Sequence, residues 1–178
     1  MQAIVVGMAD CAIADVPGQV LTTYALGSCI GLAIHDARSP VGGLLHFMLP
    51  DSAIDPERGR EKPFMFADTG IPLLLDRMRA MGASRHGLVA HAVGGAQIMD
   101  EGNVFAIGRR NYLATRRILW KAGILLRGEV VGGGRSRTMR LEIGTGRIWL
   151  DEGGSRVELT ATALRIGGLD GVPRLDCR

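Results

Sequence analysis

The chain has 178 residues, of which 47% are hydrophobic and 22% charged, and its formal net charge at pH 7 is +3. This composition excludes a disordered or fibrous protein and is typical of one folded globular domain. No apolar run approaches the roughly 18–20 residues that cross a bilayer, and the opening MQAIVVGMADC lacks the basic stretch of a secretory signal. We therefore expect a cytoplasmic domain without membrane insertion.

The basic residues and the cysteines narrow the class further. Arginine supplies nearly all of the positive charge and concentrates between Arg109 and Arg147. No aromatic stacking motif accompanies these arginines, so we expect an acidic protein surface as partner and no nucleic acid. Cys11, Cys29 and Cys177 include no CxxC pair, which argues against a zinc ribbon and a disulfide framework.

The first fifty residues are dominated by short apolar runs. Aliphatic and β-branched residues predict strands over 2–8, 11–16 and 18–26. Two more runs, 29–36 and 42–50, are separated by ARSP, whose proline and small polar neighbours favour a turn. These two runs predict a β-hairpin.

The middle of the chain predicts two helices. Polar residues interrupted by proline and glycine over 51–63 predict an exposed loop. Apolar residues at helical spacing predict a helix within 64–83, with Pro72 tolerated near its first turn. A buried strand and a glycine turn follow over 86–99, and a second helix is expected over 108–123.

The last third returns to strands, predicted over 124–133, 138–150 and 156–162, the second of them containing the hairpin turn GTGR. Strands at both ends with two helices between them indicate an α+β fold in layers, without regular βαβ alternation. We expect one domain over residues 1–160 and a C-terminal tail of unknown role over 161–178.

The register of the predicted hairpin decides whether Cys29 and His46 can meet. A two-residue loop places Cys29 opposite His46, whereas a four-residue loop places Cys29 opposite Met48, with His46 on the diagonal. Both registers put the thiol and the imidazole on one face, at positions about 5–8 Å apart, and an odd-length loop separates them. The sequence leaves both productive registers open.

A cysteine within reach of an imidazole can pass it a proton and become a nucleophile. Gly27 and Ser28 precede Cys29 in a tight turn whose backbone amides could face an oxyanion. The alternative is that Cys29 packs in the core as a small hydrophobic residue.

Metal and anion sites have weaker support. Possible ligands are Cys29, His35, His46, His86 and His91, but the last two are five residues apart, which suits neither a helix face nor a strand face. We therefore expect no metal and no cofactor. The runs VGGGRSR and VGGAQ are interpreted as turns, the second of a kind that can line a cleft.

Several stretches together resemble the CheD family, the chemoreceptor glutamine deamidases of bacterial and archaeal chemotaxis. The resemblance rests on LGSC followed 17 residues after its cysteine by the histidine of HFMLPDS, and it continues through FADTGIPLLLDRMRAMGA, VGGAQIM, IGRRN and GGGRSRTMRLEIGTGRIWL. It covers most of the chain from Met1 to about Glu158.

The resemblance implies roles for particular residues. Cys29 would be the nucleophile, His46 the base, and Thr23, six residues before the cysteine, the third member of a triad; Thr22 is an adjacent, less well matched hydroxyl. The sequence has Ala25 where the family usually carries glycine. The implied fold is a layered β-sandwich with outer helices, like that of glutamine-deamidating toxins.

The resemblance also implies an activity and partners. A glutamine of a methyl-accepting chemotaxis receptor would be converted to glutamate through a cysteine thioester, and glutamate methyl esters would be further substrates. A CheC-type phosphatase is a second implied partner. The alternative is a non-catalytic chemotaxis adaptor that binds the phosphatase or the receptors.

Overall fold

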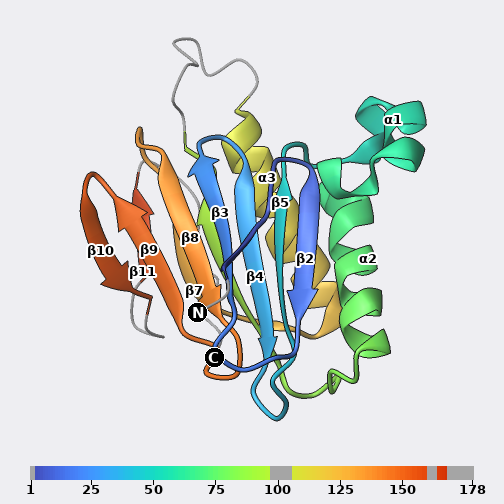
Figure 1. Cartoon of the computed structure of the whole chain (residues 1–178). Helices are drawn as coiled ribbons and strands as arrows, with labels where there is room; N and C mark the ends of the chain where they lie inside the picture. The colour runs from blue at the N-terminus through green and yellow to red at the C-terminus, as the bar shows by residue number, and fades with distance from the viewer. Residues whose placement is uncertain (1–2, 97–105, 160–163, 168–178) are drawn as a thin grey trace, which may run out of the picture.

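The computed structural model describes residues 3–96, 106–159 and 164–167, the last of these as backbone only. Two β-sheets pack face to face, and helices cover the outer face of one of them (Figure 1). The arrangement is an α+β fold in layers, as the sequence predicts. Among the described residues, no helix is long and apolar enough to cross a membrane.

The central layer is a six-stranded mixed sheet with the order β11-β7-β6-β4-β5-β2. Its strands are β2 (Asp10–Ala14), β4 (Ile30–Asp36), β5 (Gly42–Phe47), β6 (Leu88–Gly94), β7 (Leu125–Gly132) and β11 (Leu164–Gly167). The strands β4, β5 and β6 are buried almost throughout, because both faces of this sheet are covered. Continuous apolar runs therefore form its middle.

The second sheet has five strands in the order β1-β3-β8-β9-β10. They are β1 (Ala3–Val5), β3 (Val20–Leu26), β8 (Arg137–Glu142), β9 (Ile148–Glu152) and β10 (Ser155–Glu158). Burial alternates along β8, as expected for a sheet with one covered face and one face in solvent. The predicted turn VGGGRSR joins β7 to β8.

Two long helices, α2 (Ala67–Ala80) and α3 (Ile107–Ala122), pack on the central sheet. The helix α2 begins only at Ala67, because Pro63–Met65 forms a separate 3-10 turn, so Pro72 lies in its second turn. Gly123 ends α3 in a left-handed conformation, with φ of 68°. Both predicted helices are confirmed, with these changes in their bounds.

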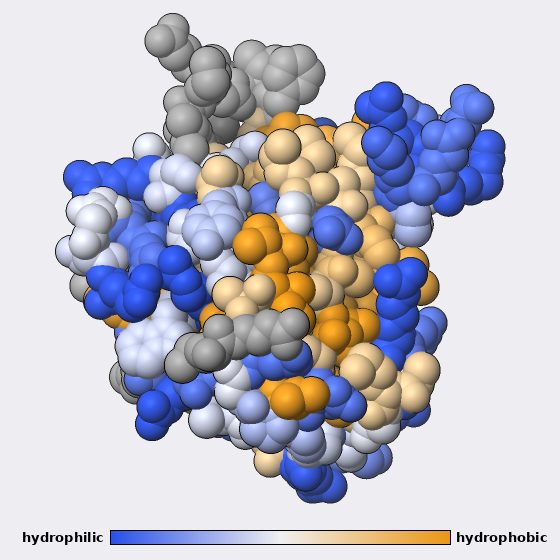
Figure 2. Space-filling model, viewed as in Figure 1, coloured by the Kyte–Doolittle hydropathy of each residue, from blue (hydrophilic) through white to orange (hydrophobic). Residues whose placement is uncertain are grey.

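The segment predicted as an exposed loop contains the short helices η1 (Ser52–Ile54) and α1 (Pro56–Glu61). Asp55 accepts a hydrogen bond from the N–H of Arg58, and Pro56 occupies the first helical position. The prediction of a loop was therefore wrong for these two short helices, whereas the predicted exposure of the segment is confirmed. Figure 2 shows its hydrophilic surface at the upper right.

The core has two parts, one on each face of the central sheet. Between the central sheet and the helices lie Ile34, Phe47, Leu74 and Tyr112, among others. Between the two sheets lie Leu21, Leu44, Met139 and further aliphatic residues. A side chain on the inner face of β4 or β5 therefore meets the five-stranded sheet.

The end of the chain adds one strand to the central sheet. The backbone of Leu164–Gly167 pairs in parallel with Glu129–Gly132 of β7. The central sheet thus extends past residue 160, where the predicted tail begins. The rest of that tail, Cys177 included, lies outside the described residues.

Candidate functional site

The hairpin of β4 and β5 has the four-residue loop, which was one of the two productive registers. The N–H of Asp36 donates to the carbonyl of Val41 at 2.9 Å, so residues 37–40 form the loop. Within the ladder, Gly31 pairs with His46 and Ile30 with Phe47. Cys29 directly precedes β4, two residues before Gly31, and this alternation places Cys29 and His46 on the same face.

That face is the one between the two sheets. A side chain at Gly31 would meet Leu26 and Met139 of the five-stranded sheet, and the absence of one leaves room beside His46. The imidazole of His46 is buried, with an exposed fraction of 1%, whereas Cys29 is partly exposed. The thiol can meet a substrate from outside, and the imidazole is shielded from solvent.

Thr23 of β3 reaches His46 from the opposite sheet. Its hydroxyl oxygen lies 2.7 Å from Nδ1 of His46 and 2.8 Å from the carbonyl oxygen of Val6. The single hydroxyl proton must go to the Val6 carbonyl, which only accepts, so the hydroxyl oxygen accepts the Nδ1 proton of neutral His46. This tautomer leaves Nε2 unprotonated, and Nε2 has no hydrogen-bond partner among the described residues.

Thr22 and Thr23 point to opposite faces of β3. Thr23 contacts His46 in the interior, while Thr22 lines a hollow on the other face with Val20 and Tyr24. After Thr23 the pairing of β3 with β8 shifts register, and Ala25 takes a φ of 57°. The position where the resembled family usually carries glycine thus has a backbone conformation that favours glycine.

Three consecutive carbonyl groups before and at Cys29 are held by hydrogen bonds. The carbonyl of Gly27 accepts from the N–H of Ala96 at 2.8 Å, and that of Cys29 from the N–H of Gly95 at 2.8 Å. The carbonyl of Ser28 accepts from Nδ2 of Asn111 at 3.0 Å. Because the peptide bonds are trans, the carbonyl of one residue and the N–H of the next residue point in opposite directions.

Two backbone N–H groups near the thiol, those of Ser28 and Cys29, donate to no oxygen atom among the described residues. Interaction of the Cys29 thiol with its own backbone N–H partly offsets the effect of burial, which raises the thiol pKa. Within the described part of the chain, no acceptor is bonded to the N–H of Ser28. These N–H groups can stabilise negative charge that develops beside Cys29.

The glycine turn after β6 lies against the Cys29 backbone, as the run VGGAQ indicates. A Cβ atom at Gly94 would lie only 2.2 Å from the carbonyl oxygen of Cys29, and Gly94 has a φ of 119°. Any side chain there would displace the Cys29 turn. Gln97, the last residue of that run, lies outside the described residues.

Burial favours the neutral forms of both Cys29 and His46. It raises the pKa of the Cys29 thiol, and it lowers the pKa of the His46 imidazole from 6.5 to about 4. At neutral pH the pair is therefore a thiol and a free imidazole base, not a thiolate and an imidazolium. If the sulfur acts as a nucleophile at neutral pH, its proton has to be transferred as it attacks.

The other possible metal ligands do not gather around Cys29. His35 lies near the loop end of β4, and its ring stacks on that of His91 in β6 with the centroids 5.8 Å apart. His86 is exposed. No group of three or more histidine, cysteine or carboxylate side chains that could hold a metal ion occurs among the described residues.

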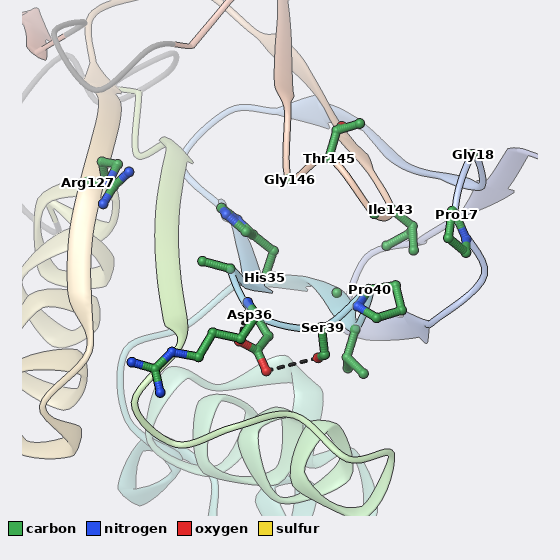
Figure 3. A pocket seen from close by; sticks show the side chains of 15 residues that line it. Pro17, Gly18, His35, Asp36, Ser39, Pro40, Arg127, Ile143, Thr145 and Gly146 are labelled. Carbon is green, nitrogen blue, oxygen red and sulfur yellow. Dashed lines mark hydrogen bonds between the residues drawn. The ribbon is translucent and has the colours of Figure 1, made fainter.

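A cavity of about 760 Å³ lies at the far end of the hairpin, where β4 ends at Asp36 (Figure 3). His35 and Arg127 line it, but Asp36 is occupied by hydrogen bonds from Arg38, Ser39 and Ser84. Seven residues of strand, roughly 20 Å, separate this end from Cys29. The cavity is therefore separate from the site at Cys29.

The arginines between Arg109 and Arg147 do not form one surface. Arg137, Arg140 and Arg147 pair with acidic residues of their own sheet. On α3, by contrast, Arg110 and Arg117 are exposed and form no ion pair with another described residue. Only part of the predicted basic surface is thus open to a partner.

Arg110 and Arg117 line a hollow of about 290 Å³ together with Pro50, Asp51, Leu113 and Ala114. This hollow lies beside the Cys29 site, because Asn111 of the same helix contacts Ser28. Sequence reasoning assigned no role to Asn111, although IGRRN was recognised. Nor did it identify the Val6 carbonyl, since backbone acceptors leave no mark in a sequence.

Comparison with known proteins gives a consistent result. The family model described as CheD chemotactic sensory transduction matches residues 48–152, a range that begins two residues after His46. The chain is 61% identical over 168 residues to a probable chemoreceptor glutamine deamidase CheD of Solibacter usitatus, which covers 94% of this chain and 99% of the relative.

More distant relatives bear the same kind of name. A probable chemoreceptor glutamine deamidase CheD 2 of Anaeromyxobacter dehalogenans is 47% identical over 153 residues, covering 86% of this chain and 96% of the relative. A probable chemoreceptor glutamine deamidase CheD of Pyrococcus horikoshii is 39% identical over 150 residues, covering 83% of this chain and 91% of the relative.

Proposed function

Because this chain belongs to the CheD family, we propose that it is a protein-glutamine deamidase that acts on methyl-accepting chemotaxis receptors. The names of its relatives support this activity. The observation that carries the assignment to a site is the contact of Thr23 with His46, which leaves Nε2 as a free base on the same face as Cys29.

The reaction begins with the attack of Cys29 Sγ on the side-chain carboxamide carbon of the receptor glutamine. His46 accepts the thiol proton as the C–S bond forms, because burial keeps its imidazole neutral at physiological pH. The carbonyl π electrons move to oxygen, and the resulting oxyanion receives hydrogen bonds from the N–H groups of Ser28 and Cys29.

The tetrahedral intermediate then collapses. His46 gives its proton to the carboxamide nitrogen, and the C–N bond breaks. Ammonia leaves, and the acyl group remains bound to Cys29 as a thioester. A water molecule attacks the thioester carbon while His46 takes a proton from the water. The C–S bond breaks, the sulfur recovers its proton, and the product is a glutamate side chain.

The supporting residues determine how well this base works. Thr23 fixes the tautomer and the ring orientation of His46, in the role that a carboxylate or amide often has in other triads. The carbonyl of Gly27, which accepts from the N–H of Ala96, anchors the turn before Cys29. No metal or cofactor takes part.

Glutamate methyl esters are further substrates in this proposal, because they present the same acyl group with methanol as the leaving group. Each reaction adds one negative charge to a receptor helix and so shifts its signalling equilibrium. A CheC-type phosphatase is a second partner. The alternative function is an adaptor that binds receptor or phosphatase without catalysis.

The test is incubation of the protein with a receptor signalling fragment, followed by mass spectrometry. Replacement of NH2 by OH raises the mass of a modified glutamine peptide by about 1 Da. We expect this gain with the wild-type protein and its loss with Cys29→Ala, since no neighbour replaces the attacking atom. Cys11→Ser serves as the matched thiol control and should retain activity. Binding of the fragment without any mass gain would favour the adaptor.

A further inference from the structure

Asn111 joins the two segments that carry the proposed nucleophile and base. It lies on the inner side of α3 with an exposed fraction of 0%. Its Nδ2 donates to the carbonyl of Ser28 at 3.0 Å and to the carbonyl of Met48 at 2.8 Å. One carbonyl directly precedes Cys29, and the other lies two residues after His46.

The orientation of the amide follows from its partners. Two carbonyl oxygens can only accept, so the NH2 group of Asn111 must face them, and both of its protons are used. The Oδ1 atom has no hydrogen-bond partner among the described residues. All hydrogen bonds of this side chain in the described structure are therefore directed at the two segments of the site.

The Ser28 carbonyl belongs to the same peptide unit as the N–H of Cys29. In a trans peptide the two groups point in opposite directions, so a bond that fixes the carbonyl also fixes the direction of the N–H. A hydrogen bond accepted by the carbonyl also polarises the N–H and strengthens it as a donor. The neighbouring carbonyls are held by backbone N–H groups, and only this one depends on a side chain.

We propose that Asn111 is a positioning residue for the deamidation reaction, holding the Ser28–Cys29 peptide so that its N–H stabilises the oxyanion formed at Cys29. The second bond, to Met48, keeps this peptide at a fixed position relative to the strand of His46. The inference rests on the proposed function, because it assigns a role within that reaction.

The main variant is Asn111→Leu, which keeps a similar size and removes both donors. The matched control is Thr115→Val one turn later in α3, where a buried hydroxyl donates only to the carbonyl of Asn111. Two rates are measured for each: turnover of the receptor fragment and alkylation of Cys29 by iodoacetamide. Alkylation is a displacement at carbon that forms no oxyanion, so it reports the thiol and base alone.

For Asn111→Leu we expect the turnover number to fall about 100- to 1000-fold, as for loss of an oxyanion donor. Alkylation of Cys29 should change less than about threefold. Thr115→Val should leave both rates near those of the wild type. Equal losses of turnover and alkylation, unchanged turnover, or the same turnover loss in Thr115→Val would each overturn the proposal.

Asn111→Asp is the second variant, in case the leucine variant does not fold. Its ionised carboxylate would face two carbonyl oxygens, whereas the protonated form regains one donor. Turnover relative to wild type should therefore rise as the pH falls from 8 to 5, which a purely structural role does not produce. A constant ratio, or unfolding of both variants, would overturn the proposal.

A spectroscopic measurement separates this inference from the proposed function. In a ¹⁵N-labelled sample of either folded variant, the amide proton of Cys29 should move upfield, since its peptide loses a hydrogen bond at the carbonyl. An unmoved Cys29 amide would contradict the positioning role even if the wild type proved inactive. A wild type without turnover, together with a shifted amide, would contradict the proposed function alone.

Discussion

At the scale of single residues, two features of the site are unusual: His46 is buried away from water, and the backbone of Ala25 has a left-handed conformation. Burial deprives His46 of water and leaves it neutral, and Thr23 supplies a hydrogen bond that orients it. Ala25 adopts a backbone conformation that L-residues avoid, just before the Cys29 turn. Both features can be tested by changing one side chain.

Thr23→Val keeps the shape of the side chain and removes the acceptor for the Nδ1 proton of His46. Because orienting a base contributes less than supplying the nucleophile, we expect turnover of the receptor fragment to fall about 10- to 1000-fold, less than for Cys29→Ala. Thr22→Val is the control and should have little effect, since Thr22 faces away from His46. A loss at Thr22 as large as that at Thr23 would reassign the third member of the triad.

Ala25→Gly should stabilise the protein. The residue is exposed and has a φ of 57°, so glycine relieves backbone strain without a loss of buried surface. We expect the free energy of unfolding, measured by urea denaturation, to rise by up to about 1 kcal/mol. Ala12→Gly in the regular strand β2 should lower it instead. A decrease for Ala25→Gly would show that the strain is offset elsewhere.

At the scale of elements, α3 links the site to the surface. Its inner side carries Asn111, which contacts the Cys29 turn, and its outer side carries Arg110 and Arg117 beside a hollow next to Pro50. The helix contains five basic residues and no acidic one over Ile107–Ala122. An acidic receptor helix docked there would lie close to Cys29, the proposed nucleophile.

Charge reversal on α3 should weaken the binding of a receptor fragment. Raising salt from 50 to about 300 mM should weaken wild-type binding several-fold through screening, and Arg110→Glu with Arg117→Glu should reduce both the affinity and this salt dependence. Arg127→Glu makes the charge change of one of these two substitutions at the distant cavity, and it serves as the control for each of them made singly. Binding that ignores both salt and the α3 variants would indicate apolar docking elsewhere.

At the scale of the whole molecule, packing two layers against the central sheet buries histidines that would otherwise be protonated near pH 6. His46 and His91 both have a pKa lowered from 6.5 to about 4 by burial. Between those values the unfolded chain binds protons that the folded protein does not. Stability therefore rises with pH in this window and is lost as the pH falls through it.

We expect the free energy of unfolding to decrease from pH 6.5 to pH 4, with a slope of up to about 1.4 kcal/mol per pH unit for each of the two groups. Urea denaturation at several pH values measures it. His91→Gln should remove part of the slope if it folds. Asp36 and Asp151, whose pKa values are lowered from 3.8 by hydrogen bonds and arginines, add to acid unfolding only below this window. A flat profile above pH 4 would contradict burial as the cause.

The sequence by itself determined the local features of this protein. Apolar alternation and turn residues located the hairpin, helical spacing located α2 and α3, and the 17-residue separation restricted Cys29 and His46 to one face for any even loop. These features depend on residues that are close together along the chain, so a local sequence pattern is enough to predict them. The short helix α1 was missed even though Asp55 and Pro56 are helix-start signals, because its prolines and glycine suggested a loop.

Only the tertiary structure decided how the two sheets meet. The approach of Thr23 from the other sheet, the acceptance of its proton by Val6, and the bonds from Asn111 join segments 17 to 83 residues apart. The structure also selected the four-residue hairpin loop over the two-residue one. The free energies of these contacts depend on how the layers of the fold pack together. The burial that lowers the pKa of His46 likewise exists only once both sheets are assembled. A sequence pattern carries periodicity along one strand, but not which strand of another sheet lies opposite it.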